Sequence, residues 1–172
     1  MLKGLITGLF FFALSVFFSV MLGYDSIDGI ATVNVIIQQL PLLLLMTAIP
    51  SVAEDILTRG YLYGHLFSRM KPEIWVLVSA VLYVLNHIWR LQEDPSVLVY
   101  LFLLGLVLAV TVWKTRSLWL AFGIHWGANI AFESTHSLVQ TTPLVHHFGS
   151  TWLLAAAWLL LLVLMSFRLP RQ

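Results

Sequence analysis

Long apolar segments separated by short polar breaks run along most of the chain. The first, from about Gly4 to Leu22, carries no charged side chain and is followed by Asp25 and Asp28. A helix of about 20 apolar residues is long enough to cross the hydrocarbon core of a bilayer. We therefore predict an all-α fold, a polytopic bundle of transmembrane helices, in which this first segment is retained as a helix because no small-residue cleavage site follows it.

Composition supports this class and excludes several others. Of the 172 residues, 60% are hydrophobic and 10% are charged, whereas soluble domains carry about 25% charged residues. The length allows about six or seven crossings, so we expect one integral-membrane domain over residues 1–172. The net charge of +1 gives no reason to expect a nucleic-acid partner, and the absence of cysteine excludes disulfides, thiolate catalysis and cysteine-bound metal.

The second apolar stretch, from about Ile30 to His65, is too long for one straight crossing at about 1.5 Å per residue. It contains Pro41 and Pro50, and we expect a broken helix with its bend at one of these prolines. Four further crossings are expected at Glu73–Trp89, Val97–Trp113, Leu118–Ser134 and Trp152–Phe167.

The basic residues indicate the orientation of the chain. Six crossings with both termini in the cytoplasm leave only Arg90 outside and Arg59 within the membrane. The other basic residues then lie on the cytoplasmic side: Lys3, Arg69, Lys71, Lys114, Arg116, Arg168 and Arg171. Positive residues concentrate on that side of the cell (inner) membrane, so the pattern favours this topology.

Three charged residues, Glu54, Asp55 and Arg59, lie inside the second passage. Each costs about 2.5 kcal/mol or more at membrane depth, so such residues usually face a polar cavity and serve a function. Asp55 and Arg59 are four residues apart and can pair on one helical face. Glu54 points about 100° away and remains free for another partner. The alternative is an ion pair that only orders the bundle, which would leave Glu54 unexplained.

Two histidines and an asparagine lie in later crossings. His87 is near the end of one crossing, and His125 and Asn129 share a face in the middle of another. Taken singly, His87 could be an interfacial residue and the other two a packing hydrogen bond between helices. Together with Glu54 they suit hydrolysis, because a carboxylate in low dielectric can serve as general base. A histidine can hold the attacking water, and a histidine with an amide can donate to an oxyanion.

At this point the sequence resembles a known family, the CAAX-protease and bacteriocin-processing membrane proteins, which include the type II CAAX prenyl endopeptidases. The family motifs are Glu-Glu-x-x-x-Arg, Phe-x-x-x-His and His-x-x-x-Asn, in that order. The corresponding residues of this chain are Glu54, Asp55 and Arg59, then Tyr83 and His87, then His125 and Asn129. The resemblance covers about Pro50 to Phe132, with Asp55 replacing the second glutamate and Tyr83 replacing phenylalanine.

The resemblance implies a glutamate-type intramembrane endopeptidase acting on a membrane-associated protein or peptide. It implies that Glu54 activates water, that His87 helps bind this water, and that His125 and Asn129 form the oxyanion hole. Asp55, Arg59 and Tyr83 would support them. We expect no cofactor.

Other functions stay open. Glu54, His87 and His125 could instead hold zinc with water as the fourth ligand. A non-catalytic immunity or regulatory protein, or a small transporter, could also use a buried carboxylate. Nothing in the sequence identifies the substrate.

Overall fold

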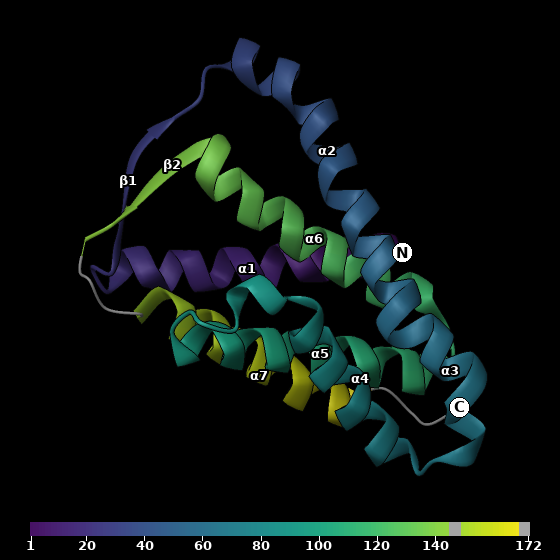
Figure 1. The fold of residues 1–172 in the computed structure, drawn as a ribbon. Helices are drawn as coiled ribbons and strands as arrows, with labels where there is room; N and C mark the ends of the chain where they lie inside the picture. Colours follow the sequence, from purple (N-terminus) through teal and green to yellow (C-terminus); the bar gives the residue numbers. More distant parts are fainter. Residues whose placement is uncertain (145–148, 169–172) are drawn as a thin grey trace.

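Helices make up most of the part of the chain that this computed structural model describes, residues 1–144 and 149–168 (Figure 1). The α-helices in these residues are α1 (Leu2–Met21), α2 (Val33–Asp55), α3 (Tyr61–Leu66), α4 (Pro72–Asn86), α5 (Pro95–Thr115), α6 (Leu118–Ser137) and α7 (Gly149–Arg168). The strands are β1 (Asp25–Ile30) and β2 (Val139–Pro143). The predicted all-α bundle is confirmed, with one short pair of strands added.

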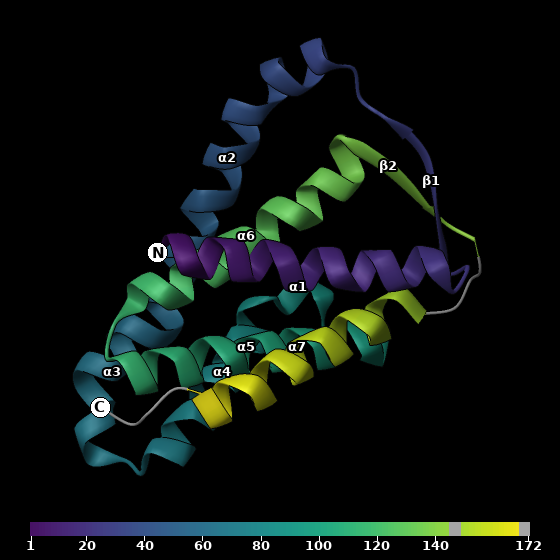
Figure 2. The ribbon, with the colours of Figure 1, turned by 180° about the vertical axis from the view of Figure 1, so that it is seen from behind.

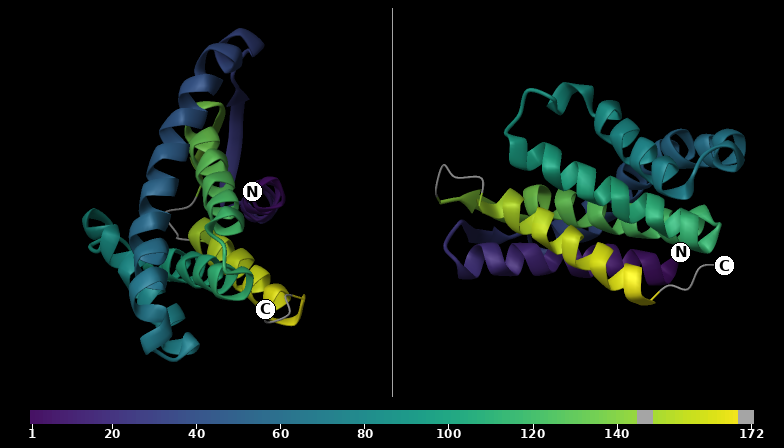
Figure 3. Two further views of the ribbon diagram at one scale, coloured as in Figure 1. Left: turned by 90° about the vertical axis from the view of Figure 1, so that its right-hand side faces the viewer. Right: turned by 90° about the horizontal axis from the view of Figure 1, so that it is seen from below.

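Helix α5 lies at the centre of the bundle. It packs against α4, α6 and α7, while α1 packs against α6 and α7 (Figure 2). Val107, Leu108 and Ala109 of α5 are completely buried. Helix α2 lies outside this group, and its main packing partner is α6 (Figure 3).

Four helices are long and apolar enough to span a membrane: Leu2–Met21, Val33–Arg69, Pro95–Thr115 and Gly149–Phe167. The apolar helix Pro72–Asn86 is shorter, and α6 has 20 residues but contains His125, Asn129 and Glu133. The chain is thus a membrane protein, and the number of six crossings remains a prediction. The start of α1, the end of α7, α3 and the α5–α6 turn lie at one end of the molecule, opposite the strands (Figure 3). Arg171 lies outside the described residues.

The predicted position of the break in the second passage is wrong. Helix α2 continues through Pro41 and Pro50, as prolines can in membrane helices when neighbouring groups satisfy the freed backbone. The regular α-helix ends after Asp55, where Ile56–Gly60 form a π-helical turn. The Thr58 hydroxyl donates to the Glu54 carbonyl at 2.7 Å, and the Ser79 hydroxyl of α4 donates to the Thr58 carbonyl at 2.9 Å.

The two strands were not predicted. β1 pairs with β2 in an antiparallel ribbon whose register shifts between Ile27 and Gly29. Asp25 and Asp28, predicted to close the first helix, lie in β1, and the second passage starts at Val33 and not at the predicted Ile30. The other predicted helices are present with different ends. Helix α4 ends at Asn86, three residues before the predicted end, and is followed by a 3₁₀ turn, Ile88–Arg90.

Glycines on α1 and α6 let the two helix backbones come into contact. A Cβ added at Gly4 would lie 2.3 Å from the Leu120 carbonyl oxygen, and one at Gly8 would lie 2.1 Å from that of Ile124. On α6, a Cβ at Gly127 would lie 2.4 Å from the Leu5 carbonyl oxygen. Small residues spaced by four let helix backbones touch in this way. The crossing fixes the height and rotation of α6 against α1.

Candidate active site

Glu54 lies in the last turn of α2, immediately before the π-helical turn. Its Oε2 atom is 3.8 Å from Nε2 of His87 and 3.7 Å from Nε2 of His125. The Glu54 side chain is 18% exposed, but Oε2 itself is buried and has no hydrogen-bond partner among residues 1–144 and 149–168. A buried carboxylate oxygen without a hydrogen-bond partner in this part of the chain therefore faces two imidazole nitrogens.

His87 lies where α4 ends, with φ −95° and ψ 45°. Its Nδ1 atom is 2.9 Å from the Tyr83 carbonyl oxygen. A carbonyl can only accept a hydrogen bond, so Nδ1 carries the hydrogen and donates. In the neutral ring, Nε2 is then a hydrogen-bond acceptor turned toward Glu54.

His125 lies in the middle of α6 and is 1% exposed. Its two ring nitrogens have different neighbours. Nδ1 lies 3.3 Å from Oδ1 of Asp55, and Nε2 lies 3.1 Å from the Tyr83 hydroxyl oxygen. The Tyr83 hydroxyl on α4 bonds one ring nitrogen, and the Asp55 carboxylate on α2 lies close to the other, which makes no hydrogen bond among the described residues.

The predicted ion pair between Asp55 and Arg59 is present. Arg59 Nη1 donates to Oδ1 of Asp55, and both side chains are buried. The Arg59 guanidinium also lies over the ring of Tyr83, 4.8 Å from its centroid. Asp55 thus contacts Arg59 and His125 with the same oxygen, which links the first sequence motif directly to the third.

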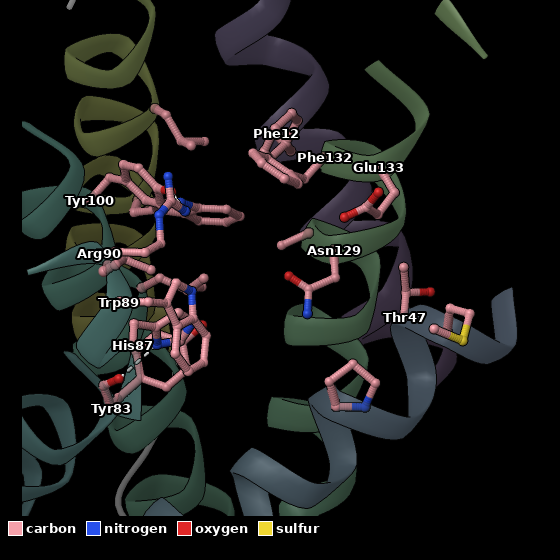
Figure 4. Close-up of a pocket in the computed structure, with 17 residues that line it drawn as sticks. Phe12, Thr47, Tyr83, His87, Trp89, Arg90, Tyr100, Asn129, Phe132 and Glu133 are labelled. Atoms are coloured by element: carbon pink, nitrogen blue, oxygen red, sulfur yellow. Dashed lines mark hydrogen bonds between the residues drawn. The ribbon is translucent and has the colours of Figure 1, made fainter. Parts of the chain in front are cut away.

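Asn129 lies one helical turn after His125 on α6. Its amide nitrogen donates to the Ser51 hydroxyl at 2.9 Å, and Ser51 in turn donates to the Thr47 carbonyl at 2.7 Å. Asn129 makes no direct hydrogen bond to Glu54 or to either histidine among the described residues. It faces His87 across a cavity instead (Figure 4).

This cavity has a volume of about 200 Å³ and is lined by residues of six helices and of the 3₁₀ turn after α4. Tyr83, His87 and Asn129 line it, whereas Glu54 and His125 do not. Of the site residues, His87, Tyr83 and Asn129 thus border the open space, and Glu54 and His125 lie next to His87 and Tyr83 without lining it.

Sequence reasoning did not include Arg90 and Tyr100, which line the cavity, among the site residues. Arg90 donates to the Tyr100 hydroxyl at 2.5 Å and twice to the Glu93 carboxylate at 2.9 Å. These bonds from Arg90 hold the pKa of Glu93 below its ordinary value. Arg90 and Tyr100 also line a second cavity of about 330 Å³ that reaches the strands. In the sequence, Arg90 could have been noticed because it is the one basic residue predicted on the outer side and lies three residues after His87.

The possible zinc ligands Glu54, His87 and His125 approach one another, but the Nε2 atom of His125 already bonds the Tyr83 hydroxyl. In the described part of the chain, no group of three or more His, Cys, Asp or Glu residues is arranged to hold a metal ion.

Comparison with known proteins gives one match. A family model described as type II CAAX prenyl endopeptidase Rce1-like matches residues 36–131, which is 96 of the 172 residues. The matched range contains all seven motif residues. No curated protein and no solved structure matches the chain significantly.

Proposed function

Since this chain belongs to the type II CAAX prenyl endopeptidase Rce1-like family, we propose that it is an intramembrane endopeptidase using Glu54 as its general base. It cleaves a membrane-associated protein or peptide near the C-terminus or a membrane segment. The observation that carries the proposal is the position of the buried Glu54 oxygen, 3.8 Å and 3.7 Å from the two imidazole nitrogens.

A water molecule fits the chemistry of the space between Glu54 and His87. Both groups accept hydrogen bonds there, since Nδ1 of His87 donates to the Tyr83 carbonyl. A water that donates to both has a lone pair left to attack a carbonyl carbon. Glu54 takes one proton during the attack, and the same carboxyl group returns it to the leaving nitrogen.

His125 and Asn129 serve the oxyanion of the tetrahedral intermediate. The Asn129 amide has two hydrogens, and Ser51 takes only one of them. The second is available to the cavity that Asn129 lines. Asp55, held by Arg59, orients the His125 ring through Nδ1. Preorganised donors of this kind stabilise charge that develops only in the transition state.

The test is Glu54→Gln, measured on a cleavable membrane-anchored reporter with purified protein. Because the amide cannot take the proton from water, cleavage should fall to background while the thermal unfolding temperature stays near that of the parent. Glu133→Gln is the matched control, because Glu133 lines the same cavity without contacting either histidine. It should keep the parent's rate. Retained cleavage by Glu54→Gln would remove Glu54 from its role.

A zinc enzyme built on Glu54, His87 and His125 would share these variants' phenotypes, so it needs its own measurement. We propose the metal-free mechanism, because the Tyr83 hydroxyl already bonds the His125 nitrogen that zinc would need. Purified enzyme should hold less than one zinc per chain and stay active in chelators. Stoichiometric zinc, with activity lost on removal and regained on addition, would establish the metalloprotease.

We further propose that the protein lies in the cell (inner) membrane with both termini in the cytoplasm and its cavity in the outer half. The cavity residues Tyr100 and Phe132 belong to the halves of α5 and α6 nearer the ribbon. Cysteines introduced at exposed Gln140 and Ser68 test this. An impermeant maleimide should label Gln140→Cys in intact cells and Ser68→Cys only after lysis. The opposite labelling would invert the topology.

A further inference from the structure

Arg90 lies at the junction of the two cavities described above. The residues that line both of them are Phe12, Arg90, Tyr100, Phe132 and Leu154. Arg90 is the charged residue among these, and an arginine side chain stays protonated in proteins. Its guanidinium carbon lies 5.7 Å from the centroid of the Tyr100 ring, and the two side chains share the cavity wall opposite Asn129 (Figure 4).

The backbone places Arg90 on the same face as His87. The Arg90 amide donates to the His87 carbonyl at 2.8 Å, within the 3₁₀ turn Ile88–Arg90. In a 3₁₀ turn, side chains three residues apart eclipse one another, and each residue advances about 2.0 Å. The two side chains therefore face the same cavity, with Arg90 about 6 Å further along the turn. Arg90 also reaches the second cavity, which extends to the strands.

The Arg90 guanidinium has more hydrogens than the protein uses. Its Nε and Nη2 atoms each donate to the Glu93 carboxylate at 2.9 Å, and Nη1 donates to the Tyr100 oxygen at 2.5 Å. A guanidinium has five N–H donors, so one hydrogen on each terminal nitrogen has no acceptor in the described part of the chain. Tyr100 lines both cavities, Glu93 lines the second, and the Arg90 side chain is 22% exposed. The guanidinium therefore lies at the open space and has donors to offer there.

The charges at the junction favour a neutral acceptor as the partner of these donors. Glu93 already balances the charge of Arg90 through two hydrogen bonds, and the Glu133 carboxylate lies on the opposite wall of the first cavity (Figure 4). A substrate carboxylate beside Arg90 would add a negative charge without a partner, which is costly where the dielectric is low. A peptide carbonyl accepts hydrogen bonds and brings no charge.

A peptide substrate supplies such carbonyls. A segment that is extended through the cavity has no helical partners for its main-chain groups, and each unsatisfied group is costly at membrane depth. A donor on the wall therefore stabilises the bound segment. An extended chain advances about 3.3 Å per residue, so the distance of about 6 Å from His87 to Arg90 corresponds to about two residues of substrate.

We propose that Arg90 binds a main-chain carbonyl of the substrate about two residues from the scissile bond, on the side toward the β1–β2 ribbon. The inference rests on the proposed function and adds a binding residue to it. Glu93 and Tyr100 are positioning residues that hold the guanidinium at the cavity. Every residue has a main-chain carbonyl, so Arg90 binds the substrate without selecting a side chain at that position.

Arg90→Gln removes the charged donor. We expect KM to rise about tenfold, as for loss of one hydrogen bond from a charged group. The bound carbonyl is not the one attacked, so kcat should change less than about twofold. Arg69→Gln is the matched control, because Arg69 is exposed and lines neither cavity. It should keep the parent's KM, and thermal unfolding of both variants measures any loss of stability.

Synthetic membrane-anchored reporters with a single thioamide test the same bond from the substrate side. Sulfur accepts hydrogen bonds weakly, so exchange of the bound carbonyl oxygen should raise the parent's KM about threefold. The largest effect should occur about two residues from the cleaved bond. The same thioamide should change the KM of Arg90→Gln less than that of the parent. Equal effects in the two proteins would overturn the inference.

Tyr100→Phe decides the question if Arg90→Gln does not fold. It keeps the ring and the bonds from Arg90 to Glu93, but the guanidinium loses one of the groups that fix its position. We expect KM to rise about threefold and the thioamide effect to become smaller. Parental values of both quantities would contradict the inference.

The proposed function and this inference fail in different ways. A parent that cleaves no reporter, or a fully active Glu54→Gln, removes the proposed function and this inference with it. Parental KM in Arg90→Gln beside an inactive Glu54→Gln removes this inference alone. A lower kcat at unchanged KM in Arg90→Gln would also remove it, because Arg90 would then act on the transition state.

Discussion

The two sides of α6 are built in opposite ways. Toward α1 the backbones touch at the crossing, because Gly8 and Gly127 have no side chains there. Toward α2 the contact is made by side chains. Trp126 Nε1 donates to the Leu44 carbonyl at 3.2 Å and to the Thr47 hydroxyl at 3.1 Å, and Asn129 donates to Ser51.

On α6, the side toward α1 therefore positions the helix, and the side toward α2 carries the groups that could act on substrate. Backbone contact with α1 tolerates almost no displacement, since interiors are close-packed. It therefore holds His125 and Asn129 in place without using their side chains. The α2 side has directional hydrogen bonds and a neighbouring cavity, so its polar groups remain available to substrate. Substitutions on the two sides should consequently change different measured quantities.

The largest effect is expected from Asn129→Ala, on the α2 side. Loss of an oxyanion donor should lower kcat about 10²- to 10³-fold, with KM nearly constant. The cost in unfolding free energy should stay near that of one hydrogen bond, about 1 kcal/mol. Steady-state kinetics with purified protein measures the first quantity and denaturant titration the second. A raised KM at unchanged kcat would mean that Asn129 binds substrate only.

The next effect is expected from Gly8→Ala, on the α1 side. The new Cβ would lie 2.1 Å from the Ile124 carbonyl oxygen, so the helices must separate. Overpacking of this kind costs roughly 1–3 kcal/mol, which thermal unfolding in detergent should detect. The variant should also lose activity, because α6 moves. Unchanged stability would show that this crossing does not fix α6.

A smaller effect is expected from Trp126→Phe. The change removes the indole N–H that bonds Leu44 and Thr47 but keeps a ring to stack on Phe122. We expect a loss of about 0.5–1.5 kcal/mol in unfolding free energy and less than a twofold change in kcat. A loss larger than that of Gly8→Ala would reverse the proposed ranking of the two sides.

The smallest effect is expected from Gly64→Ala, which serves as the control for Gly8→Ala. Gly64 in α3 has no atom within 4 Å of a built Cβ. Gly64→Ala should therefore stabilise the helix, by up to about 1 kcal/mol. Thermal unfolding beside Gly8→Ala compares the same substitution with and without a steric conflict. Destabilisation of similar size at both positions would mean that helix crossing is not the cause.

Sequence reasoning succeeded where spacing along one helix decides the contact. Asp55 and Arg59 pair as their separation of four predicts, and apolar length predicted most of the helices. Contacts between motifs on different helices could not be predicted from the sequence. The hydrogen bond of His125 to Tyr83 and its close approach to Asp55 depend on how three helices pack, and no motif encodes that packing.

The two errors have a shared physical origin. The π-helical turn at Ile56–Gly60 and the β1–β2 ribbon are both completed by groups far away in the sequence. The Ser79 hydroxyl of α4 donates a hydrogen bond to the Thr58 carbonyl in the turn. In the ribbon, Asp25 pairs with Pro143. Pro41 and Pro50 gave a stronger local signal for a bend, but a membrane helix can absorb a proline when its surroundings satisfy the backbone.

The glycine crossing has a consequence for biogenesis. Gly8 and Gly127 are about 120 residues apart, and ribosomes add roughly 5–20 residues per second. Helix α1 therefore waits roughly 6–24 seconds, at that rate, before the segment that becomes its partner has been made. During this interval its bare glycine surface is open to any other small-residue helix in the bilayer. A chaperone or insertase that shields α1 until α6 is synthesised would protect the nascent chain from pairing with the wrong helix.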